Sequence, residues 1–341
     1  MDWISPQFSR SRVDSAGDIL ISGTVDVAAL DEALTIINNW RSSHSRPLYT
    51  FRLGLRRHAE KLDDNALVAQ RIKRLSSIKL KLRLSHGMKL SRMHDIGGCR
   101  AVVSSSQLVT RLVKHYKSSD IKHKLLREDD YITNPKPSGY RSHHLIYGYY
   151  SDKKATHNGL RIEMQFRSQL QHAWATAVET VGTFIRQALK SSVGEREWLR
   201  FFALMGTAIA LREHTAPVPN TPTEEGELKL EIRDYAKRLD VASRLKTYGA
   251  ALQTVEEPVA DAEYYLLELD TSAMRVNVLG YTKRELTKAQ VDYLRTEKEI
   301  AGASGDAVLV SVDSMAALRR AYPNYFLDTK RFVEELERAI A

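Results

Sequence analysis

The sequence predicts an α/β (α+β) protein in which helices pack against a mixed sheet. Short runs of branched and aromatic residues, at 100–103, 144–150 and 160–166, predict buried strands. Segments with apolar residues at helical spacing lie before and between these strands, for example at 25–40 and 107–116. A second group of strands and helices follows residue 257. This order of elements is typical of a mixed sheet with helices against it.

Length and composition limit the possible classes of protein. With 341 residues the chain can bury a sizeable core and has room for two domains. Its net charge of +9 and pI near 9.4 favour an anionic partner, although a charge of this size also serves ordinary solubility. The single cysteine, Cys99, excludes a disulfide within the chain and a cysteine-based zinc cluster.

Hydropathy gives an expectation about location. No stretch approaches the roughly 20 apolar residues of a membrane span, and residues 1–12 lack the apolar segment of a signal peptide. We therefore expect a cytoplasmic protein with no membrane partner.

The first part of the chain is predicted to be mainly helical. Residues 1–23 are expected to form an irregular arm, followed by helices at 25–40 and 48–62. A third helix is expected at 65–83, running into a basic stretch. Further on, helices are predicted at 107–116, 168–189, 195–214 and 228–252, strands at 121–130, 144–150 and 160–166, and a hairpin loop at 153–159.

Residues 215–227 contain three prolines and no periodicity, which predicts a linker. The helices on either side of it can still pair with each other. From residue 257 we predict a compact unit with strands at 264–270, 273–281 and 307–312 and helices at 282–300, 314–321 and 328–340. The predicted division is therefore a domain at 1–255 and a smaller α+β domain at 256–341.

A basic stretch at 71–100 carries the first sign of chemistry. Cations at Arg71, Lys73 and Lys81 precede Asp95, which stands at the edge of the strand containing Arg100. Polyphosphate binding needs such a set, with cations for the phosphate oxygens and a carboxylate for the bridging magnesium ion. A solvated helix face would give the same pattern.

Two further stretches strengthen the functional interpretation. The loop at 130–144 has two prolines and a glycine, and it leads into a segment rich in aromatic and hydroxyl side chains. The alternation at 161–167 places two arginines, Glu163 and Gln165 on one face of a strand. Such a face is either the solvent-exposed side of a sheet or the floor of a polar active site.

Together these stretches resemble the synthetase domain of the RelA/SpoT family, the pyrophosphokinases that move the β,γ-pyrophosphate of ATP onto a ribose hydroxyl. The resemblance rests on four motifs in order along the chain: R-x-K…S…K (Arg71, Lys73, Ser77, Lys81), D-x-x-G-x-R (Asp95, Gly98, Arg100), G-Y-x-S-x-H (Gly139, Tyr140, Ser142, His144) and E-x-Q-x-R (Glu163, Gln165, Arg167). Residues 171–175, which follow, are similar to the helix that closes the family's site. The resemblance implies a nucleotidyltransferase-like sheet.

The resemblance also implies a role for each motif residue. Asp95 and Glu163 would be the catalytic residues and bind Mg²⁺, and Glu163 would also draw the proton from the attacking hydroxyl. Arg71 and Arg100 would sandwich the adenine of ATP, while Lys73, Ser77 and Lys81 hold its phosphates. Tyr140 would stack on the acceptor base, with His144 and Gln165 completing the acceptor pocket.

Residues 256–341 are similar to the pseudo-zinc-finger domain of fused toxin–antitoxin members of the family, the CapRel type. In those proteins a Y-x-x-Y motif enters the ATP site and shuts it, and Tyr322 and Tyr325 match that motif here. Two tyrosines three residues apart also pack commonly into a local core. Tyrosine rings can stack on the guanidinium planes that would otherwise hold adenine, which gives the autoinhibitory interpretation a physical basis.

Two acceptors remain open. The toxin-like relatives imply transfer to the 3′-terminal adenosine of tRNA, which would stop translation, with release of the enzyme by a phage structural protein such as a major capsid protein (abortive infection). The alternative is GDP or GTP, as in (p)ppGpp synthesis, although residues 175–180 lack the Tyr-Lys ending of many such enzymes. A third interpretation is a catalytically inactive nucleotide- or RNA-binding module. The sequence leaves the oligomeric state open.

Overall fold

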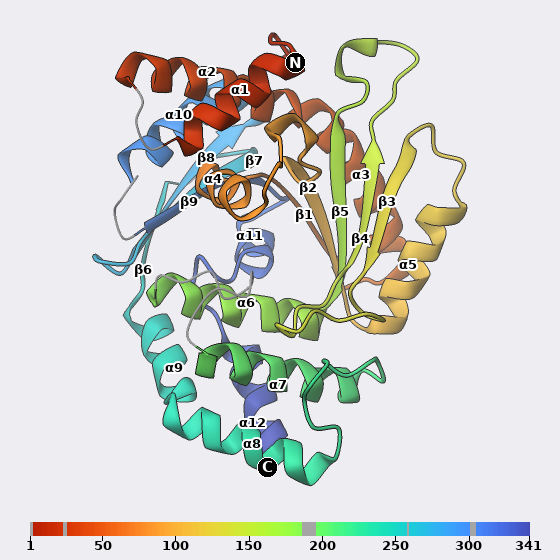
Figure 1. Cartoon of the computed structure of the whole chain (residues 1–341), viewed down its shortest axis with the longest axis vertical. Helices are drawn as coiled ribbons and strands as arrows, with labels where there is room; N and C mark the ends of the chain where they lie inside the picture. Colours follow the sequence, from red (N-terminus) through yellow and green to blue (C-terminus); the bar gives the residue numbers. More distant parts are fainter. Residues whose placement is uncertain (1–2, 23–25, 186–195, 258, 301–304) are drawn as a thin grey trace.

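A nine-stranded mixed sheet is the centre of the molecule (Figure 1). The computed structural model describes residues 3–22, 26–185, 196–257, 259–300 and 305–341. In spatial order the strands are β3-β4-β5-β2-β1-β9-β7-β8-β6. Their bounds are β1 Leu67–Ile72, β2 Gly97–Val103, β3 Lys124–Asp130, β4 His143–Gly148, β5 Arg161–Ser168, β6 Gln253–Glu257, β7 Ala262–Asp270, β8 Arg275–Thr282 and β9 Gly305–Ser311. The pairs β2–β5 and β6–β8 are parallel and the other neighbours antiparallel, which confirms the predicted mixed sheet.

Helices cover both faces of this sheet. Their bounds are α1 Arg10–Ile21, α2 Val27–Ser43, α3 Ser45–Leu62, α4 Leu75–Leu84, α5 Ser106–Ser118, α6 Gln169–Phe184, α7 Arg196–Arg212, α8 Glu225–Arg238, α9 Val241–Ala251, α10 Leu286–Glu299, α11 Met315–Ala321 and α12 Lys330–Ile340. α3 and α5 bury an apolar face, including Phe51, Leu55 and Leu112, against β1, β2 and β5. The opposite face of β1 and β2 is therefore left for α6 and α11, and the polar motif residues lie there.

The C-terminal segment joins the same sheet. β9 pairs with β1 over two residue pairs, Gln70 with Ser311 and Arg71 with Val310. The sheet thus runs across the predicted division at 255/256, and α11 lies in the middle of the molecule, above α6 in the view of Figure 1. The division itself stays a prediction.

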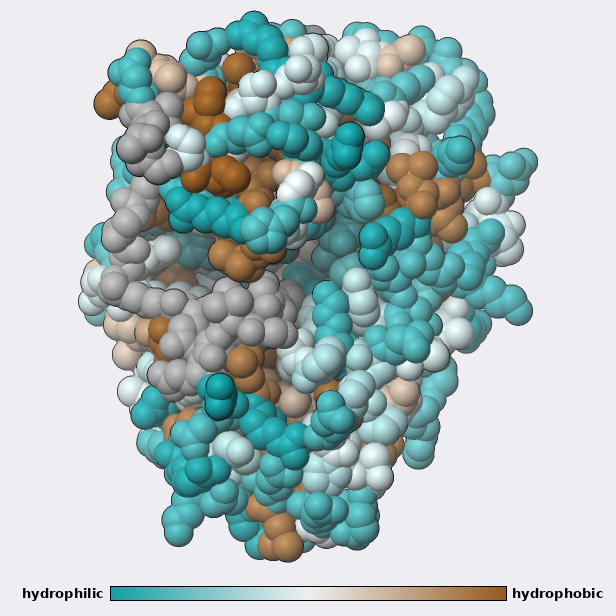
Figure 2. All heavy atoms as spheres, viewed as in Figure 1, coloured by the Kyte–Doolittle hydropathy of each residue, from teal (hydrophilic) through white to brown (hydrophobic). Residues whose placement is uncertain are grey.

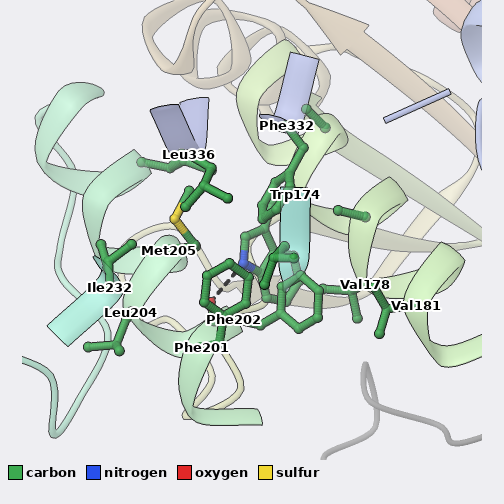
Figure 3. Packing of buried hydrophobic residues seen from close by; sticks show 14 of the residues in the cluster. Trp174, Val178, Val181, Phe201, Phe202, Leu204, Met205, Ile232, Phe332 and Leu336 are labelled. Atoms are coloured by element: carbon green, nitrogen blue, oxygen red, sulfur yellow. Dashed lines mark hydrogen bonds between the residues drawn. The ribbon is translucent and has the colours of Figure 1, made fainter. Parts of the chain in front are cut away.

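The last helix packs into a core that the earlier helices form. Phe332, Val333 and Leu336 of α12 are buried together with residues of α6, α7, α8 and α9. Figure 3 shows the ring of Phe332 beside Trp174 and Phe202, and the indole of Trp174 donates a hydrogen bond to the carbonyl of Phe202 at 2.9 Å. The apolar core below the sheet therefore contains residues from both sides of the predicted division.

The structure corrects two predictions near the N-terminus. Residues 10–21, expected to be irregular, form α1, whose apolar side is buried. Residues 65–83, expected to be one helix, divide into β1 and α4. The strand forms because its backbone finds partners on both sides, β2 and β9, and neither partner can be read from local periodicity.

Two further differences concern the end of the first predicted domain. The helix expected at 228–252 is broken into α8 and α9 at Asp240, whose φ of 49° lies in the left-handed region. β6 was not predicted. The segment expected to be a linker packs against α7, since Val218 is buried and its N–H donates to Thr207 Oγ1 at 2.9 Å.

The other predicted helices and strands are confirmed to within a few residues. Residues 186–189 and 195, at the ends of two expected helices, lie outside the described residues. In the described part of the chain, no helix combines the length and the apolar character that crossing a membrane requires. The face seen in Figure 2 is mostly hydrophilic, as expected for a chain rich in charged residues.

Candidate active site

Asp95 lies between two lysines. Its carboxylate accepts hydrogen bonds from Lys73 Nζ at 2.7 Å and from Lys81 Nζ at 2.9 Å. Lys73 directly follows β1 and its N–H donates to the carbonyl of Ile96 at 2.8 Å, while Lys81 comes from α4. Burial acts to raise the pKa of Asp95, but the two lysines outweigh burial and hold that pKa far below its ordinary value. The predicted carboxylate is therefore ionised and paired.

Five side chains form a closed hydrogen-bonded ring on β4, β5 and the loop before them. Glu163 contacts His144 Nδ1 at 3.0 Å and accepts from Gln165 Nε2 at 2.7 Å. His144 Nε2 lies 2.9 Å from the hydroxyl of Tyr140, to which Arg167 donates at 2.8 Å. Arg167 also donates to Gln165 Oε1 at 3.2 Å, which closes the ring. The strand register positions this ring, since His144 stands opposite Gln165.

The ring contains an ion pair. Burial acts to lower the pKa of His144, but Tyr140 and Glu163 outweigh it and raise that pKa to about 9. Burial acts to raise the pKa of Glu163, but His144 outweighs it and lowers that pKa to about 2. Both groups are therefore charged near neutral pH.

Arg167 has no assigned role in the sequence-based prediction, although it belongs to the E-x-Q-x-R alternation that suggested the site. Its side chain is 1% exposed, and its Nε and Nη1 atoms have no hydrogen-bond partner among the described residues. Its guanidinium carbon lies 5.2 Å from the centre of the Tyr140 ring. A buried cation with two free donors is suited to an anion.

Asp95 and Glu163 fit a magnesium ion as a pair of hard oxygen donors. Asp95 precedes β2, and Glu163 lies on the adjacent parallel strand opposite Gly98. The two carboxylates are within electrostatic reach of each other, because Asp95 acts to raise the pKa of Glu163. Within the described part of the chain, no group of three or more His, Cys, Asp or Glu side chains is placed to hold a metal ion. Mg²⁺ needs only one or two carboxylates where phosphates and water supply the other ligands.

Tyr322 covers the arginine expected to hold adenine. The guanidinium carbon of Arg100 lies 5.3 Å from the centre of the Tyr322 ring, and Arg100 donates a hydrogen bond to the carbonyl of Ala321. The Tyr322 hydroxyl donates to the carbonyl of Gln70 at 3.1 Å. Burial and the neighbouring Arg167 lower the pKa of Arg100 to about 10, which leaves it charged. The Tyr322 ring therefore covers one face of the Arg100 guanidinium group in this conformation.

Tyr325 lies beside the first turn of α4. Its hydroxyl donates to Asp306 at 3.1 Å, and Arg74 forms an ion pair with the same carboxylate. Arg74 also donates to Ser77 Oγ at 3.3 Å, so Ser77 lies next to this group. Arg71 is within electrostatic reach of both tyrosines: burial acts to lower its pKa, but Glu179, Tyr322 and Tyr325 raise it.

Tyr140, the expected acceptor platform, is packed rather than open. Its side chain is 5% exposed and lies edge-on to Tyr131 and Trp174. Gly139 allows this packing, because its φ is +89° and an added Cβ would lie 2.7 Å from the carbonyl oxygen of Phe202. Stacking on an acceptor base would require this neighbourhood to open.

The structure thus brings the predicted residues into three groups on one face of the sheet. The first group is Asp95 with Lys73 and Lys81, the second is the ring around Glu163, and the third is Arg71 and Arg100 with the two C-terminal tyrosines. Ser77 lies at the edge of the third group. Their chemical roles stay predictions, but their arrangement suits a polyanion held over two carboxylates.

Comparison with known proteins identifies the region that carries these groups. Residues 70–182 match the family described as "Region found in RelA / SpoT proteins". The match covers about a third of the chain, and we call these residues the RelA/SpoT region. That region includes all three motif groups apart from the C-terminal tyrosines.

Relatives of the RelA/SpoT region are known in sequence and in structure. GTP pyrophosphokinase YjbM of Bacillus subtilis (strain 168) is 30% identical over 133 residues, which are 36% of this chain and 60% of that protein's length. Small alarmone synthetase 1 of Bacillus subtilis, solved with its product pppGpp, has 19% identity and a TM-score of 0.39, covering 60% of this chain and 93% of its own. A GTP pyrophosphokinase family protein from Streptococcus pneumoniae has 22% identity and a TM-score of 0.40, covering 57% and 92%.

Proposed function

We propose that the protein is a pyrophosphokinase that uses ATP as its donor. The observation that carries this proposal is the pair of half-buried, ionised carboxylates in the RelA/SpoT region, Asp95 just before β2 and Glu163 on the neighbouring strand β5. Cations surround the pair, as a phosphate-transfer site requires. The GTP pyrophosphokinase YjbM, 30% identical over part of its length, supports the same class of reaction.

The proposed reaction needs charge neutralisation and alignment. The acceptor hydroxyl oxygen forms a bond to the β-phosphorus of ATP, the bond from that phosphorus to the α,β-bridging oxygen breaks, and AMP leaves. The hydroxyl proton passes to Glu163, while Lys73 and Lys81 exchange part of their contact with Asp95 for phosphate oxygens. Mg²⁺ held by Asp95 and Glu163 would neutralise charge on the transferred group.

We further propose the 3′-terminal adenosine of tRNA as the acceptor. The basic net charge, the C-terminal segment over the site and the missing Tyr-Lys ending after Trp174 support this choice. GDP or GTP remains the second candidate, since YjbM is a GTP pyrophosphokinase by name. Pyrophosphorylation of tRNA would block aminoacylation and inhibit translation.

The proposal includes autoinhibition by residues 256–341. Its support is the position of Tyr322 on Arg100, where the ring would overlap with adenine if Arg100 holds it, and of Tyr325 on Arg74, beside the predicted phosphate ligand Ser77. Activation then needs a partner that draws this segment away. We propose a phage structural protein, such as a major capsid protein, as that partner in anti-phage defence.

Transfer of label from γ-³²P-ATP tests the proposal. The Tyr322→Ala protein is offered total tRNA in one reaction and GDP with GTP in another, with Asp95→Ala in the same chain as control. Label on tRNA that the control lacks supports the tRNA enzyme, whereas label on guanosine nucleotides alone selects the second candidate. Absence of Asp95-dependent label on either acceptor would favour an inactive binding module.

A further inference from the structure

A cavity of about 690 Å³ lies outside the candidate active site. It opens between the start of α6, the ends of β1 and β2, and the segment from α11 to α12. Its lining includes Leu67, Val102, His172, Arg320, Lys330 and Arg331. None of the residues predicted from the sequence to act in catalysis, substrate binding or autoinhibition lines it.

The cavity shares a sheet face with the active site but is separated from it. Val102 is two residues beyond Arg100 on β2, so both side chains point to the same face. Tyr322 lies on Arg100, and the next residue, Pro323, lines the cavity. The turn after α11 therefore stands between the two sites.

The wall of the cavity is basic. Six arginine or lysine side chains and three aspartate or glutamate side chains line it. Three of the cations are paired with carboxylates: Arg212 and Arg338 with Glu335, and Arg319 with Glu256.

The other three cations, Arg320, Lys330 and Arg331, have no ion pair with a carboxylate among the described residues. Arg320 donates to the carbonyl of Asn65 at 3.1 Å, and Arg331 donates to Gln169 Oε1 at 2.6 Å. Lys330 Nζ has no hydrogen-bond partner in the described part of the chain. Two lining carboxylates, Asp328 and Glu334, likewise make no ion pair in the described part of the chain, so the unpaired lining side chains keep a small excess of positive charge, which favours an anion.

The start of α12 adds to the positive potential around the cavity. Lys330 and Arg331 are the first two residues of that helix, and the preceding Thr329 makes no side-chain cap. The helix N-terminus carries partial positive charge, and of its first N–H groups that of Lys330 donates to Asp328 Oδ1 at 3.3 Å. The buried residues Leu67, Val102 and Phe332 form the apolar part of the wall.

We propose that this cavity binds a nucleoside polyphosphate. Its volume lies within the range of small-molecule sites, of about 300–1,000 Å³. The phosphates would contact Arg320, Lys330 and Arg331, and the base would lie against the apolar wall. Because the wall comes from both α6 and α12, the bound ligand links the RelA/SpoT region to the C-terminal segment and stabilises their present arrangement.

Calorimetric titration of the full-length protein with ATP, GTP, pyrophosphate and adenosine, in the presence of a chelator, tests this site. The variant Lys330→Glu/Arg331→Glu reverses two adjacent cations, and it is expected to weaken nucleotide binding about tenfold or more. Glutamate in the first turn of a helix is favourable, so α12 should still form. The matched control is Lys153→Glu/Lys154→Glu, which reverses two adjacent exposed cations far from the cavity lining.

The expected result is nucleotide binding to the wild type and the control with equal affinity, weak binding to the cavity variant, and a nucleotide-induced rise in melting temperature that the cavity variant lacks. Equal affinity in all three proteins, equal loss in both variants, or no binding to the wild type would overturn the proposal. Pyrophosphate binding as tightly as ATP and GTP would overturn its nucleoside part.

Discussion

Asp95 holds two lysines that would otherwise repel each other beside the sheet. Lys73 and Lys81 both donate to its carboxylate, and all three side chains are at most 34% exposed. Burial acts to lower the pKa of Lys73, and Asp95 opposes that change. The carboxylate therefore balances the charge of the two lysines, in addition to its predicted role as a ligand of Mg²⁺.

Replacing Asp95 with asparagine should reduce label transfer by roughly 100-fold or more, because charge stabilisation in the transition state is lost. The change preserves the size of the side chain. Transfer is measured in the Tyr322→Ala chain, where the acceptor is the one that the labelling experiment selects.

Asp64→Asn is a suitable control, since Asp64 is an exposed acid ahead of β1. It should leave transfer unchanged. Equal activity of all three chains would mean that the Asp95 carboxylate takes no part in catalysis.

The His144–Glu163 pair should make stability depend on pH. The pKa of His144 is raised to about 9 in the folded protein, so its contribution is complete below its ordinary value and is lost as the pH rises toward 9. The pKa of Glu163 is lowered to about 2, so its contribution is complete above its ordinary value and is lost as the pH falls toward 2. We expect the pair to contribute most between about pH 4.5 and 6.5.

Chemical denaturation at pH 6.5, 7.5 and 8.5 checks this prediction. The wild type should lose stability across the series, at up to roughly 1 kcal/mol for each pH unit. The His144→Gln variant should show a flatter profile. Parallel profiles for the two proteins would contradict the raised pKa of His144.

At the scale of elements, the turn after α11 places an aromatic ring on the predicted adenine site. Tyr322→Ala removes both the ring over Arg100 and the hydroxyl that donates to Gln70. We expect this variant to be toxic on expression, and Asp95→Ala in the same chain to cancel the toxicity. Tyr325→Ala should have the same effect through Arg74.

Tyr322→Phe separates the ring from the hydroxyl. It keeps the contact with Arg100 and loses only the hydrogen bond, so it should remain harmless. Tyr322→Ala chains that are folded yet harmless would falsify the autoinhibitory role, while toxicity of Tyr322→Phe would assign the inhibition to the hydroxyl.

α10 holds the start of α4 through one buried carboxylate. Glu297 accepts from the N–H of Leu75 at 2.7 Å and from Arg41 Nη1 at 2.6 Å. Arg41 in turn donates to the carbonyl of Lys73 at 3.0 Å and lies over the ring of Tyr293. The C-terminal segment thus caps the helix that carries Ser77 and Lys81.

Glu297→Gln should lower the free energy of unfolding by about 3 kcal/mol, because Arg41 is 1% exposed and would lose its counter-charge. Denaturant unfolding measures the change. Glu299→Gln, on the exposed side of the same helix, should change stability by less than about 0.5 kcal/mol. Similar effects of the two changes would argue against the buried ion pair.

Local pattern was sufficient for most elements but not for β1. The apolar spacing from Leu67 onward continues into α4 without an obvious break, so the whole stretch has the periodicity of a helix. Only pairing with β2 and β9 selects the strand. The helix break at Asp240 could not be predicted from the local sequence either, because it depends on a left-handed backbone conformation at a non-glycine residue.

Prediction of the candidate active site from the sequence is limited in the same way. The motifs identified Asp95 and Glu163, because their types and spacing are local properties. The ring that joins His144 to Glu163 depends on strand register, and the contact of Glu297 with Leu75 joins residues 222 positions apart. The resemblance supplied Tyr322, whereas the cavity beside Arg331 has no sequence signature.

At the scale of the whole molecule, the chain should unfold in one transition. One sheet and one helical core each contain residues from both sides of the predicted division. All four tryptophans lie before residue 256, and Trp3 and Trp174 pack against residues that follow it. Phe332→Ala, in the last helix, should lower the free energy of unfolding by about 3–5 kcal/mol. The unfolding midpoint measured by tryptophan fluorescence should fall accordingly.

Far-UV circular dichroism supplies the second probe, because it reports both parts. The two midpoints should coincide. Val291→Ala is the control, since Val291 is 59% exposed and lies outside the shared core. Two separate transitions, or a fluorescence midpoint insensitive to Phe332→Ala, would show that residues 256–341 fold as an independent domain.

The junction between β1 and β9 has a consequence for the proposed release of the C-terminal segment. Only two residue pairs connect these strands, so parting them breaks few backbone hydrogen bonds. It would, however, turn an interior strand into an edge strand whose N–H and C=O groups seek new partners. If the segment is released as proposed, a protein that presents an extended segment would add to β1 there and, by taking the place of β9, keep the C-terminal segment away from the candidate active site.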